Sequence, residues 1–276
     1  MKLLLTSALL SVALAASTPC TGSSSGLSQK ECDAWHNFYD ALDGPKWTAF
    51  CADKRDDPCA CNSGVGNPCK GGPSDRYAER MKQCRMKGID HHDDPNGWHE
   101  PDAGVCCQNT TDGNLHITQL AFALNGLNGT IPASITDLEE LDNLSACGND
   151  MTGQMPPFGF KKMKYLRLYR NKLQGTIPPS LTEATEMTFM SLGDNQLEGN
   201  VPDLTSMTKL TDLYLDCNKL NGTVPDDKDR QWKLSSKCFL NAHGALLEKC
   251  SNPKQDNTFD CPLPTGADKH CHATCK

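Results

Sequence analysis

The sequence predicts an α/β solenoid, a right-handed superhelix with short parallel β-strands on its concave face and a cysteine-rich cap at each end. One pattern of leucine, asparagine, glycine and proline recurs five times, with asparagines at positions 125, 149, 171, 195 and 218. This period of 22 to 24 residues is typical of stacked repeats. Of the 16 cysteines, nine lie from Cys20 to Cys107 and five from Cys238 to Cys275, so the middle of the chain is nearly free of them.

Five segments within residues 117–241 carry the full repeat. They are ITQLAFALNGLNGTIP, LDNLSACGNDMTGQMP, MKYLRLYRNKLQGTIP, MTFMSLGDNQLEGNVP and LTDLYLDCNKLNGTVP. A sixth, degenerate copy ends at Asn241, one period after the fifth. Leu210, Leu213 and Leu215 show the spacing L-x-x-L-x-L, which sends apolar side chains inward from a short strand while alternate residues face out.

The asparagine and the residues after it predict the return half of each coil. An asparagine amide offers two donors and an acceptor to the backbone groups of a buried turn. We therefore expect a ladder of stacked asparagines through the core, formed by Asn125, Asn149, Asn171, Asn195 and Asn218. The glycine then allows a turn that a Cβ would obstruct, and the proline fixes an extended path.

The unit resembles the plant-type leucine-rich repeat, L-x-x-L-x-L-x-x-N-x-L-x-G-x-I-P. That motif is found in polygalacturonase-inhibiting proteins and in the ectodomains of plant receptor kinases. The resemblance covers about half of the chain, from Ile117 to Asn241. It implies a leucine-rich repeat superhelix, and a role in recognition rather than in catalysis.

The first 16 residues predict a signal peptide. Lys2 supplies a positive charge, an apolar run starts at Leu3, and small residues suited to cleavage follow up to Ala16. A transmembrane anchor is the alternative, but it needs roughly 20 apolar residues, more than this run has. We therefore expect a secreted protein that does not span a membrane and is located in the extracellular space or cell wall.

Residues 17–116 are predicted to form an N-terminal cap, and residues 242–276 a C-terminal cap. In the first, a capping box opens at Ser28, and apolar residues at helical spacing from Trp35 onward predict an amphipathic helix across the first coil. This cap resembles that of plant-type repeat proteins, apart from an inserted loop at residues 51–94.

Because a secreted protein meets oxidising surroundings, we expect its cysteines to form disulfides. The adjacent Cys106 and Cys107 are expected to bond to different partners. Cys147 and Cys217 sit three repeats apart, on the order of 14 Å at sheet spacing, which is too far for a disulfide. We expect Cys217 to pair with Cys238 on the neighbouring coil.

Two polar clusters offer side chains that ligate metals. They are His91, His92, Asp93, Asp94 and His99 in one loop, and His270, Cys271, His272 and Cys275 in the tail. Histidines in a polar loop are usually solvated, and the tail cysteines are more simply disulfide partners, so we expect no metal and no cofactor. The sequence has no phosphate-binding glycine loop and no kinase segment, so we expect no enzymatic activity. The net charge of -7 argues against nucleic acid as a partner.

Four sequons mark candidate glycosylation sites, at Asn109, Asn128, Asn143 and Asn221. Asn128 and Asn221 fall in the turn after the strand, where a glycan would cover a lateral face. Asn143 falls on the strand itself, where a glycan would crowd one end of the concave sheet.

The outward strand positions lie six, four, two and one residues before each asparagine. At these positions the first two repeats carry uncharged residues without aromatic rings, whereas the next three carry aromatic residues, arginines and acids. We predict that these form a ligand-binding stripe on the concave face: Tyr165, Arg167, Tyr169, Arg170, Phe189, Asp212, Tyr214 and Asp216. Aromatic and arginine side chains are typical of protein-binding hot spots. The alternative is cross-strand packing of the rings, with Arg–Asp pairing inside the sheet.

The sequence thus predicts a secreted, non-catalytic recognition protein that binds an extracellular protein, peptide or glycan through its concave face, in defence or in signalling. If the inhibitor relatives are the guide, the partner is a foreign hydrolase. If the receptor relatives are, it is a peptide or a receptor ectodomain. The alternative function is that of a structural glycoprotein of the matrix or cell wall without a specific partner.

Overall fold

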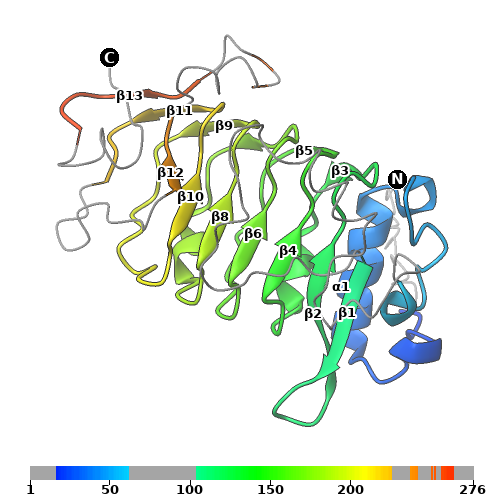
Figure 1. Ribbon diagram of the computed structural model, residues 1–276. Coiled ribbons are helices and arrows are strands. Elements are labelled where there is room, and N and C mark those ends of the chain that lie inside the picture. The colour runs from blue at the N-terminus through cyan, green and yellow to red at the C-terminus, as the bar shows by residue number, and fades with distance from the viewer. Residues whose placement is uncertain are drawn as a thin grey trace, which may run out of the picture.

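The computed structural model describes residues 17–61, 104–225, 237–241, 250, 252 and 256–263. These residues form a stack of coils, and the helix α1 (Gln29–Ala41) closes one end of it (Figure 1). The solenoid expected from the sequence is confirmed. The predicted signal peptide, most of the inserted loop and most of the C-terminal cap lie outside the described residues.

A seven-stranded sheet lines one side of the stack, in the order β1-β2-β4-β6-β8-β10-β12. Its strands are β1 Gly104–Asn109, β2 Leu115–Ala121, β4 Asn143–Ser145, β6 Tyr165–Arg167, β8 Phe189–Ser191, β10 Asp212–Tyr214 and β12 Lys237–Phe239. The strands from β2 onward run parallel, whereas β1 is antiparallel to β2. The tip of this β1–β2 hairpin projects beyond the coils (Figure 1).

The register holds from one coil to the next. A single row joins Leu120, Leu144, Leu166, Met190 and Leu213, and each of these side chains is at most 1% exposed. This row is the middle position of the L-x-x-L-x-L pattern. Because side chains alternate along a strand, the residues on either side of the row face the concave side of the sheet.

The return half of each coil carries shorter strands. β3 (Asn128–Thr130) pairs with β5 (Asp150–Thr152), and a four-stranded sheet runs in the order β13 (Thr258–Phe259), β11 (Lys219–Gly222), β9 (Gln196–Gly199) and β7 (Gln174–Gly175). Two 3-10 helices, η5 (Ala133–Asp137) and η6 (Pro179–Glu183), directly follow Pro132 and Pro178. Three more belong to the N-terminal cap: η1 (Gly22–Ser24), η2 (Gly44–Lys46) and η3 (Pro58–Ala60).

The asparagine ladder joins each coil to the one before it. Asn171 Oδ1 accepts a hydrogen bond from the backbone N–H of Met151 in the preceding coil, at 3.1 Å. Its Nδ2 donates to the carbonyl of Ala146 in that coil and to the carbonyl of Leu168 in its own coil, both at 3.0 Å. One amide therefore satisfies buried backbone groups of two neighbouring coils. The same arrangement recurs at Asn149, Asn195 and Asn218.

The ladder begins in the N-terminal cap. Asn125 Oδ1 accepts hydrogen bonds from the backbone N–H groups of Ala49 and Phe50, at 2.8 and 3.1 Å. Its Nδ2 donates to the carbonyl of Phe50 at 3.2 Å. The cap thus supplies the backbone groups that a preceding coil would otherwise provide.

The sixth coil differs from the expectation that the repeats end at Asn241. β12 pairs in parallel with β10 as a sixth coil predicts, but Asn257 takes the ladder position. Asn257 Oδ1 accepts from the N–H of Leu220 at 2.8 Å, and its Nδ2 donates to the carbonyl of Leu215 at 2.8 Å. Asn241 instead donates to the carbonyl of Asn257 at 2.7 Å. The glycine and proline of the repeat are missing after Asn241, so another segment forms the return half.

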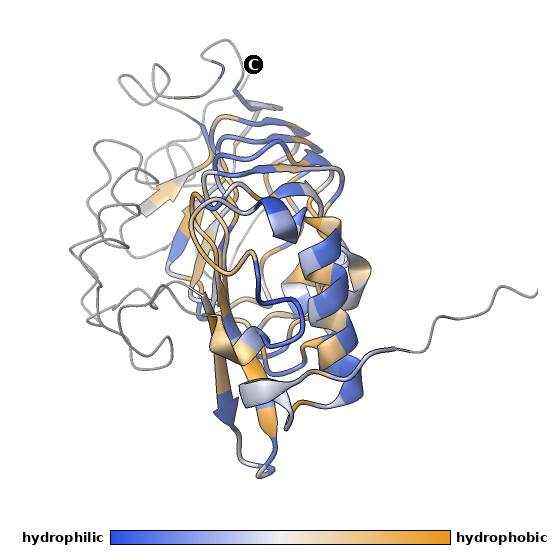
Figure 2. Cartoon of the chain, turned by 90° about the vertical axis from the view of Figure 1, so that its right-hand side faces the viewer, coloured by the Kyte–Doolittle hydropathy of each residue, from blue (hydrophilic) through white to orange (hydrophobic). Residues whose placement is uncertain are grey.

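The helix α1 packs on the first coil as predicted. Ser28 Oγ accepts a hydrogen bond from the N–H of Glu31 at 3.2 Å, which is the expected N-cap contact. The ring centroids of Trp35 and Trp47 lie 5.9 and 4.8 Å from that of Phe122 in the first coil. Figure 2 shows both hydrophobic and hydrophilic residues along α1, as expected for a helix that buries one face.

Disulfides hold the N-terminal cap together and join the fifth coil to a later segment. Those between described cysteines are Cys20–Cys32, Cys51–Cys61, Cys59–Cys107 and Cys217–Cys250. Within the described ranges no cysteine is free. Cys106 is also disulfide-bonded, and because Cys107 is bonded to Cys59, the prediction that the two adjacent cysteines have different partners is confirmed.

The predicted disulfide between Cys217 and Cys238 is wrong, because Cys217 is bonded to Cys250. Cys238 stands in register with Leu213, in the row of side chains that faces the core, and is 1% exposed. Cys217 follows its strand, directly before the ladder asparagine. Neighbouring coils therefore do not bring the two sulfur atoms together.

The Asn171→Ala substitution tests the ladder. It leaves the Met151 N–H and two buried carbonyls without their amide partner, so we expect the free energy of unfolding to fall by about 3 kcal/mol. Denaturant unfolding followed by circular dichroism measures the loss. The matched control Asn200→Ala removes an exposed amide from the return half and should change the value by less than about 0.5 kcal/mol. Equal effects at the two positions would contradict the ladder's role.

The Gly129→Ala substitution tests the contact between α1 and the first coil. Gly129 has a φ of 133°, and a Cβ there would lie 2.0 Å from the carbonyl oxygen of Ala41, at the end of α1. Backbone strain and overpacking together should lower the free energy of unfolding by about 2 kcal/mol. Gly159→Ala is the control, since its nearest atom, a Glu183 oxygen, lies 3.6 Å away. Thermal unfolding of the two variants should separate clearly, and similar melting temperatures would refute the close approach.

Candidate recognition surface

The sheet register places the predicted ligand-binding stripe on adjacent strands. Tyr165, Phe189 and Asp212 are the first residues of β6, β8 and β10, and they pair directly with one another across the sheet. Arg167 and Tyr214 are the last residues of β6 and β10, and both pair with Ser191 between them. The stripe is therefore one continuous arrangement, two rows deep, over three neighbouring coils.

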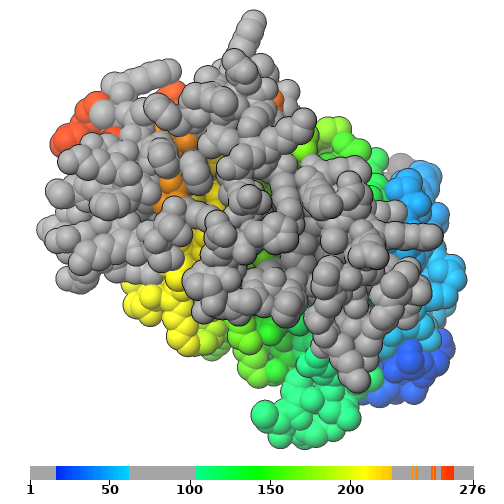
Figure 3. Space-filling view, viewed as in Figure 1, coloured from blue at the N-terminus to red at the C-terminus, as the bar shows by residue number. Residues whose placement is uncertain are grey.

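The stripe is exposed at its margins and buried in its middle. Arg170 is exposed, and Tyr165, Phe189 and Asp212 are half-buried. The remaining members are buried: Arg167 and Tyr169 at 6% exposure, Tyr214 at 1% and Asp216 at 0%. We call the accessible row of Tyr165, Phe189 and Asp212 the strand-start edge. The loops that lead into these strands form the coloured lower margin in Figure 3.

The buried arginine holds the two aromatic rings of the strand-start edge. The guanidinium carbon of Arg167 lies 4.6 Å from the ring centroid of Phe189 and 5.6 Å from that of Tyr165. The rings of Phe189 and Tyr214 are 5.5 Å apart and tilted. Burial, with the nearby charges of Asp212 and Asp216, raises the pKa of the Tyr214 phenol, so Tyr214 is neutral at physiological pH. The rings are thus fixed by cation–π and ring–ring contacts before any partner arrives.

The expected cross-strand pairing is therefore present within the stripe. Arg170 Nε lies 3.7 Å from Asp194 Oδ2 on the next coil, in addition to the ring contacts. Arg170 has a left-handed φ of 53°, which the equivalent residues Leu124, Asp194 and Cys217 share, so the position before each asparagine is a fixed bend. These contacts set the positions of the side chains and leave Tyr165, Phe189 and Arg170 in reach of solvent.

Repeat alignment misses one contributor to the concave face. Phe50, from the N-terminal cap, packs against a small apolar cluster over the first coils, formed by Ala121, Ala123, Cys147 and Tyr169. Its ring also stacks on Phe122, with centroids 5.6 Å apart. Phe50 lies outside the repeats, so no register argument points to it.

The candidate glycosylation sites differ in exposure. Asn109, Asn128 and Asn221 are exposed, whereas Asn143 is 2% exposed within the sheet. The folded protein therefore offers an acceptor amide at three of these four positions.

Metal-ligand chemistry is restricted in the described part of the chain. The group there that meets ligand spacing is Cys20, Cys32 and His36, and both of its sulfur atoms belong to one disulfide. A disulfide sulfur is not a thiolate and does not supply the anionic ligand that zinc needs. The two histidine clusters singled out in the sequence lie outside the described residues.

The comparison with family models agrees with the coil geometry. Residues 162–184, which include β6 and its return path, match the model named Leucine Rich Repeat. The coil that contains β6 is a leucine-rich repeat, and the neighbouring coils share its register. None of the curated proteins compared with the chain matches it. No described helix of the chain is long and apolar enough to cross a bilayer.

Solved leucine-rich-repeat structures resemble the chain. The ectodomain of the receptor kinase SOBIR1 from Arabidopsis thaliana is 20% identical, covers 73% of this chain and 86% of its own, and has a TM-score of 0.49. The BIR3–SERK2 complex from Arabidopsis thaliana gives 28% identity, 58% and 77% coverage, and a TM-score of 0.42. The GASSHO1/SCHENGEN3 ectodomain from Arabidopsis thaliana, in complex with CASPARIAN STRIP INTEGRITY FACTOR 2, gives 23% identity, 68% and 22% coverage, and 0.49. The fold of this chain is assigned from its own strand register and from the hydrogen bonds of its asparagine ladder.

Glycan mapping tests the exposure of the sequons. When the protein is expressed through a secretory pathway, we expect N-glycans at Asn109, Asn128 and Asn221 and none at Asn143, because its side chain lies within the sheet. Mass spectrometry of the glycopeptides measures the occupancy. Asn128→Gln should remove one glycan mass, while Asn143→Gln should leave the glycan mass unchanged. High occupancy at Asn143 would contradict the placement of β4.

Proposed function

We propose that the protein is a secreted, non-catalytic recognition protein that binds an extracellular protein partner through the strand-start edge of its concave face. The observation that carries this proposal is the pair of half-exposed rings, Tyr165 and Phe189, held from the buried side by Arg167. Side chains fixed in this way lose little conformational freedom when a partner binds them.

The surroundings of the two rings suit a protein or peptide partner. Lys164, beside Tyr165, is exposed, and Asp212 lies at the other end of the same row, so both signs of charge flank the rings. Aromatic anchors with a charged rim are the usual composition of protein-binding hot spots. A glycan could stack on the same rings, and a glycan partner is a second outcome of the experiment below.

Secretion is supported by the chemistry of the cysteines. Every described cysteine is in a disulfide, and such bonds persist in oxidising compartments. The repeat stack offers a broad surface for contact, which supports a binding role.

A capture experiment tests the strand-start edge. The wild-type protein and a Tyr165→Ala/Phe189→Ala variant are used to capture partners from native extracellular fluid. We expect a discrete partner with wild type, and at least about tenfold weaker binding by the variant, because removing a hot-spot side chain costs more than about 1.4 kcal/mol. Treatment of the captured material with protease or with glycosidase then shows whether the partner is a protein or a glycan.

A matched variant on the opposite part of the coil controls for general surface effects. Glu198→Ala/Lys219→Ala removes two exposed charged side chains from β9 and β11 and should bind the partner as wild type does. Melting temperatures of both variants show whether they remain folded. Equal binding by all three proteins would rule out the strand-start edge. Retention of all three in insoluble wall material would favour the structural-glycoprotein alternative.

A further inference from the structure

Asp216 is a buried carboxyl group whose backbone donor among the described residues is its own N–H. Its side chain is 0% exposed, and its Oδ1 atom has no hydrogen-bond partner there. The contact to its Oδ2 is Cys217 Sγ at 3.5 Å, and that sulfur is bonded to Cys250 and carries no hydrogen. A buried carboxylate normally has a cation or several donors to offset the loss of water. Among the described residues no cation offsets the burial of Asp216, and a single backbone N–H, its own, favours the ionised form.

The groups that face Asp216 add negative charge. The N–H of Asp194 donates to the Asp216 carbonyl at 2.9 Å, which sets Asp194 beside it on the neighbouring coil. Asp256, on the segment that supplies the last ladder asparagine, accepts from the Cys217 N–H at 3.1 Å. Asp194 is paired with Arg170 and Asp256 with Asn241, so those two carboxylates have their own partners. Burial opposes the ionised form most, and together with the charges of Asp256 and Asp194 it outweighs the hydrogen bond from the Asp216 N–H and raises the pKa of Asp216 to about 7.

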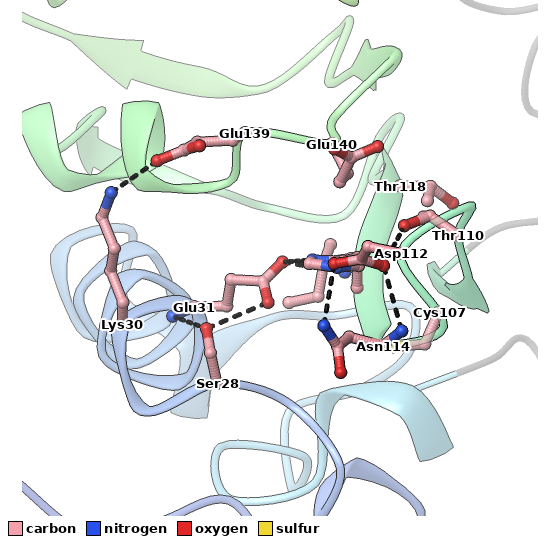
Figure 4. Close-up of polar contacts among 12 residues, drawn as sticks. Ser28, Lys30, Glu31, Cys107, Thr110, Asp112, Asn114, Thr118, Glu139 and Glu140 are labelled. Carbon is pink, nitrogen blue, oxygen red and sulfur yellow. Dashed lines mark hydrogen bonds and ion pairs between the residues drawn. The ribbon is translucent and has the colours of Figure 1, made fainter.

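His116 lies at the other end of the solenoid, between the carboxylates of Glu31 and Asp112, which Figure 4 labels. Its Nδ1 atom lies 3.2 Å from Glu31 Oε1 on α1, and its Nε2 atom lies 3.0 Å from Asp112 Oδ2 in the β1–β2 hairpin. A neutral imidazole has one N–H and could donate to only one of the two carboxylates. The doubly protonated ring donates to both, and it is the cation beside Glu31, which is 3% exposed. Desolvation opposes the charged ring, but the hydrogen bond to Asp112 and the charge of Glu31 outweigh it and raise the pKa of His116.

The other charges near His116 do not replace this contact. Glu139, on the loop before β4, adds a more distant negative charge toward His116. The Glu139 carboxylate forms an ion pair with Lys30 Nζ at 2.7 Å, and Lys30 Nζ also pairs with Asp137 at 3.4 Å. The remaining oxygen of Glu31 accepts from Ser28 Oγ at 3.1 Å, a neutral donor. The imidazolium is therefore the positive group in direct contact with the buried carboxylate.

We propose that the folded protein binds one proton at Asp216 and one at His116. These two sites make the stability of the solenoid depend on pH, so that both of its ends are more stable in mild acid than above neutrality. Asp216 sits where the returning segment closes the last coil, and His116 joins the helix α1 to the β1–β2 hairpin. The proton on Asp216 removes its repulsion with Asp256 on the returning segment, and the proton on His116 stabilises the contact between α1 and the β1–β2 hairpin.

Both protons change stability in the same direction. Asp216 binds its proton more tightly in the folded state, so the stability it contributes is complete below the ordinary pKa of 3.8 and is lost as pH rises to about 7. His116 also has a raised pKa, so its contribution is complete below 6.5 and is lost as pH rises through the higher folded value. The unfolding equilibrium constant should therefore rise by at least about tenfold from pH 5 to pH 8.

Melting temperatures at pH 5 and pH 8 test the proposal in wild type and three variants. Asp216→Asn mimics the neutral acid. We therefore expect the melting temperature of this variant at pH 8 to lie closer to that of wild type at pH 5. Its melting temperature should also differ less between pH 5 and pH 8 than that of wild type does. Asp260→Asn, an exposed aspartate, is the matched control and should retain the wild-type difference. His116→Gln should lower the melting temperature more at pH 5 than at pH 8. Equal pH differences in the Asp216 and Asp260 variants, or an equal effect of His116→Gln at both pH values, would overturn the proposal.

Two measurements on the wild-type protein keep the test independent of the variants' folding. The ¹³C shift of the Asp216 carboxyl carbon should titrate far above the ordinary value for aspartate, and the His116 ring should titrate above 6.5. Ordinary midpoints would refute the proton sites. Calcium added at pH 8 should leave the melting temperatures of wild type and Asp216→Asn unchanged. If it raised that of wild type alone, the Asp216 site would bind a cation and the proposal would fail.

Discussion

Each coil of the solenoid depends on a buried asparagine amide. Turning a chain tightly inside a hydrophobic core leaves backbone groups that no strand partner reaches, and an unsatisfied buried group costs about 1 to 3 kcal/mol. The amides of Asn149, Asn171, Asn195 and Asn218 satisfy such groups in two coils at once. This requirement sets the spacing of the coils, and through the spacing it sets the register of every side chain on the concave face.

The concave face follows from that register, although the alternation of side chains determines only the side of the sheet on which a residue lies. Tyr165 and Phe189 stand at the start of their strands and remain accessible, while Tyr214 and Asp216 point to the same side and are buried. The buried members shape the accessible ones, as Arg167 does beneath the two rings. Recognition and packing are therefore carried by different residues of the same stripe.

Much of the fold could be predicted from the sequence because the repeat is local and periodic. Every ladder asparagine from Asn125 to Asn218, the inward leucines and the helix that begins after Ser28 were predicted from spacing alone. Asn257 and the Cys217–Cys250 bond could not be, because they join segments that lie far apart in the chain and carry no repeat signature. The pairing of His116 with Glu31 likewise depends on how the cap docks on the first coil.

The origin of the last ladder asparagine has a consequence for the order in which the protein is made. β12 completes the strand side of the sixth coil by residue 239, but the amide that satisfies Leu220 belongs to residue 257. During synthesis the earlier coils can stack as they emerge, since each carries its own asparagine. The return half of the final coil stays unpaired until the segment that contains Asn257 has been synthesised. This end of the stack is therefore completed last during translation.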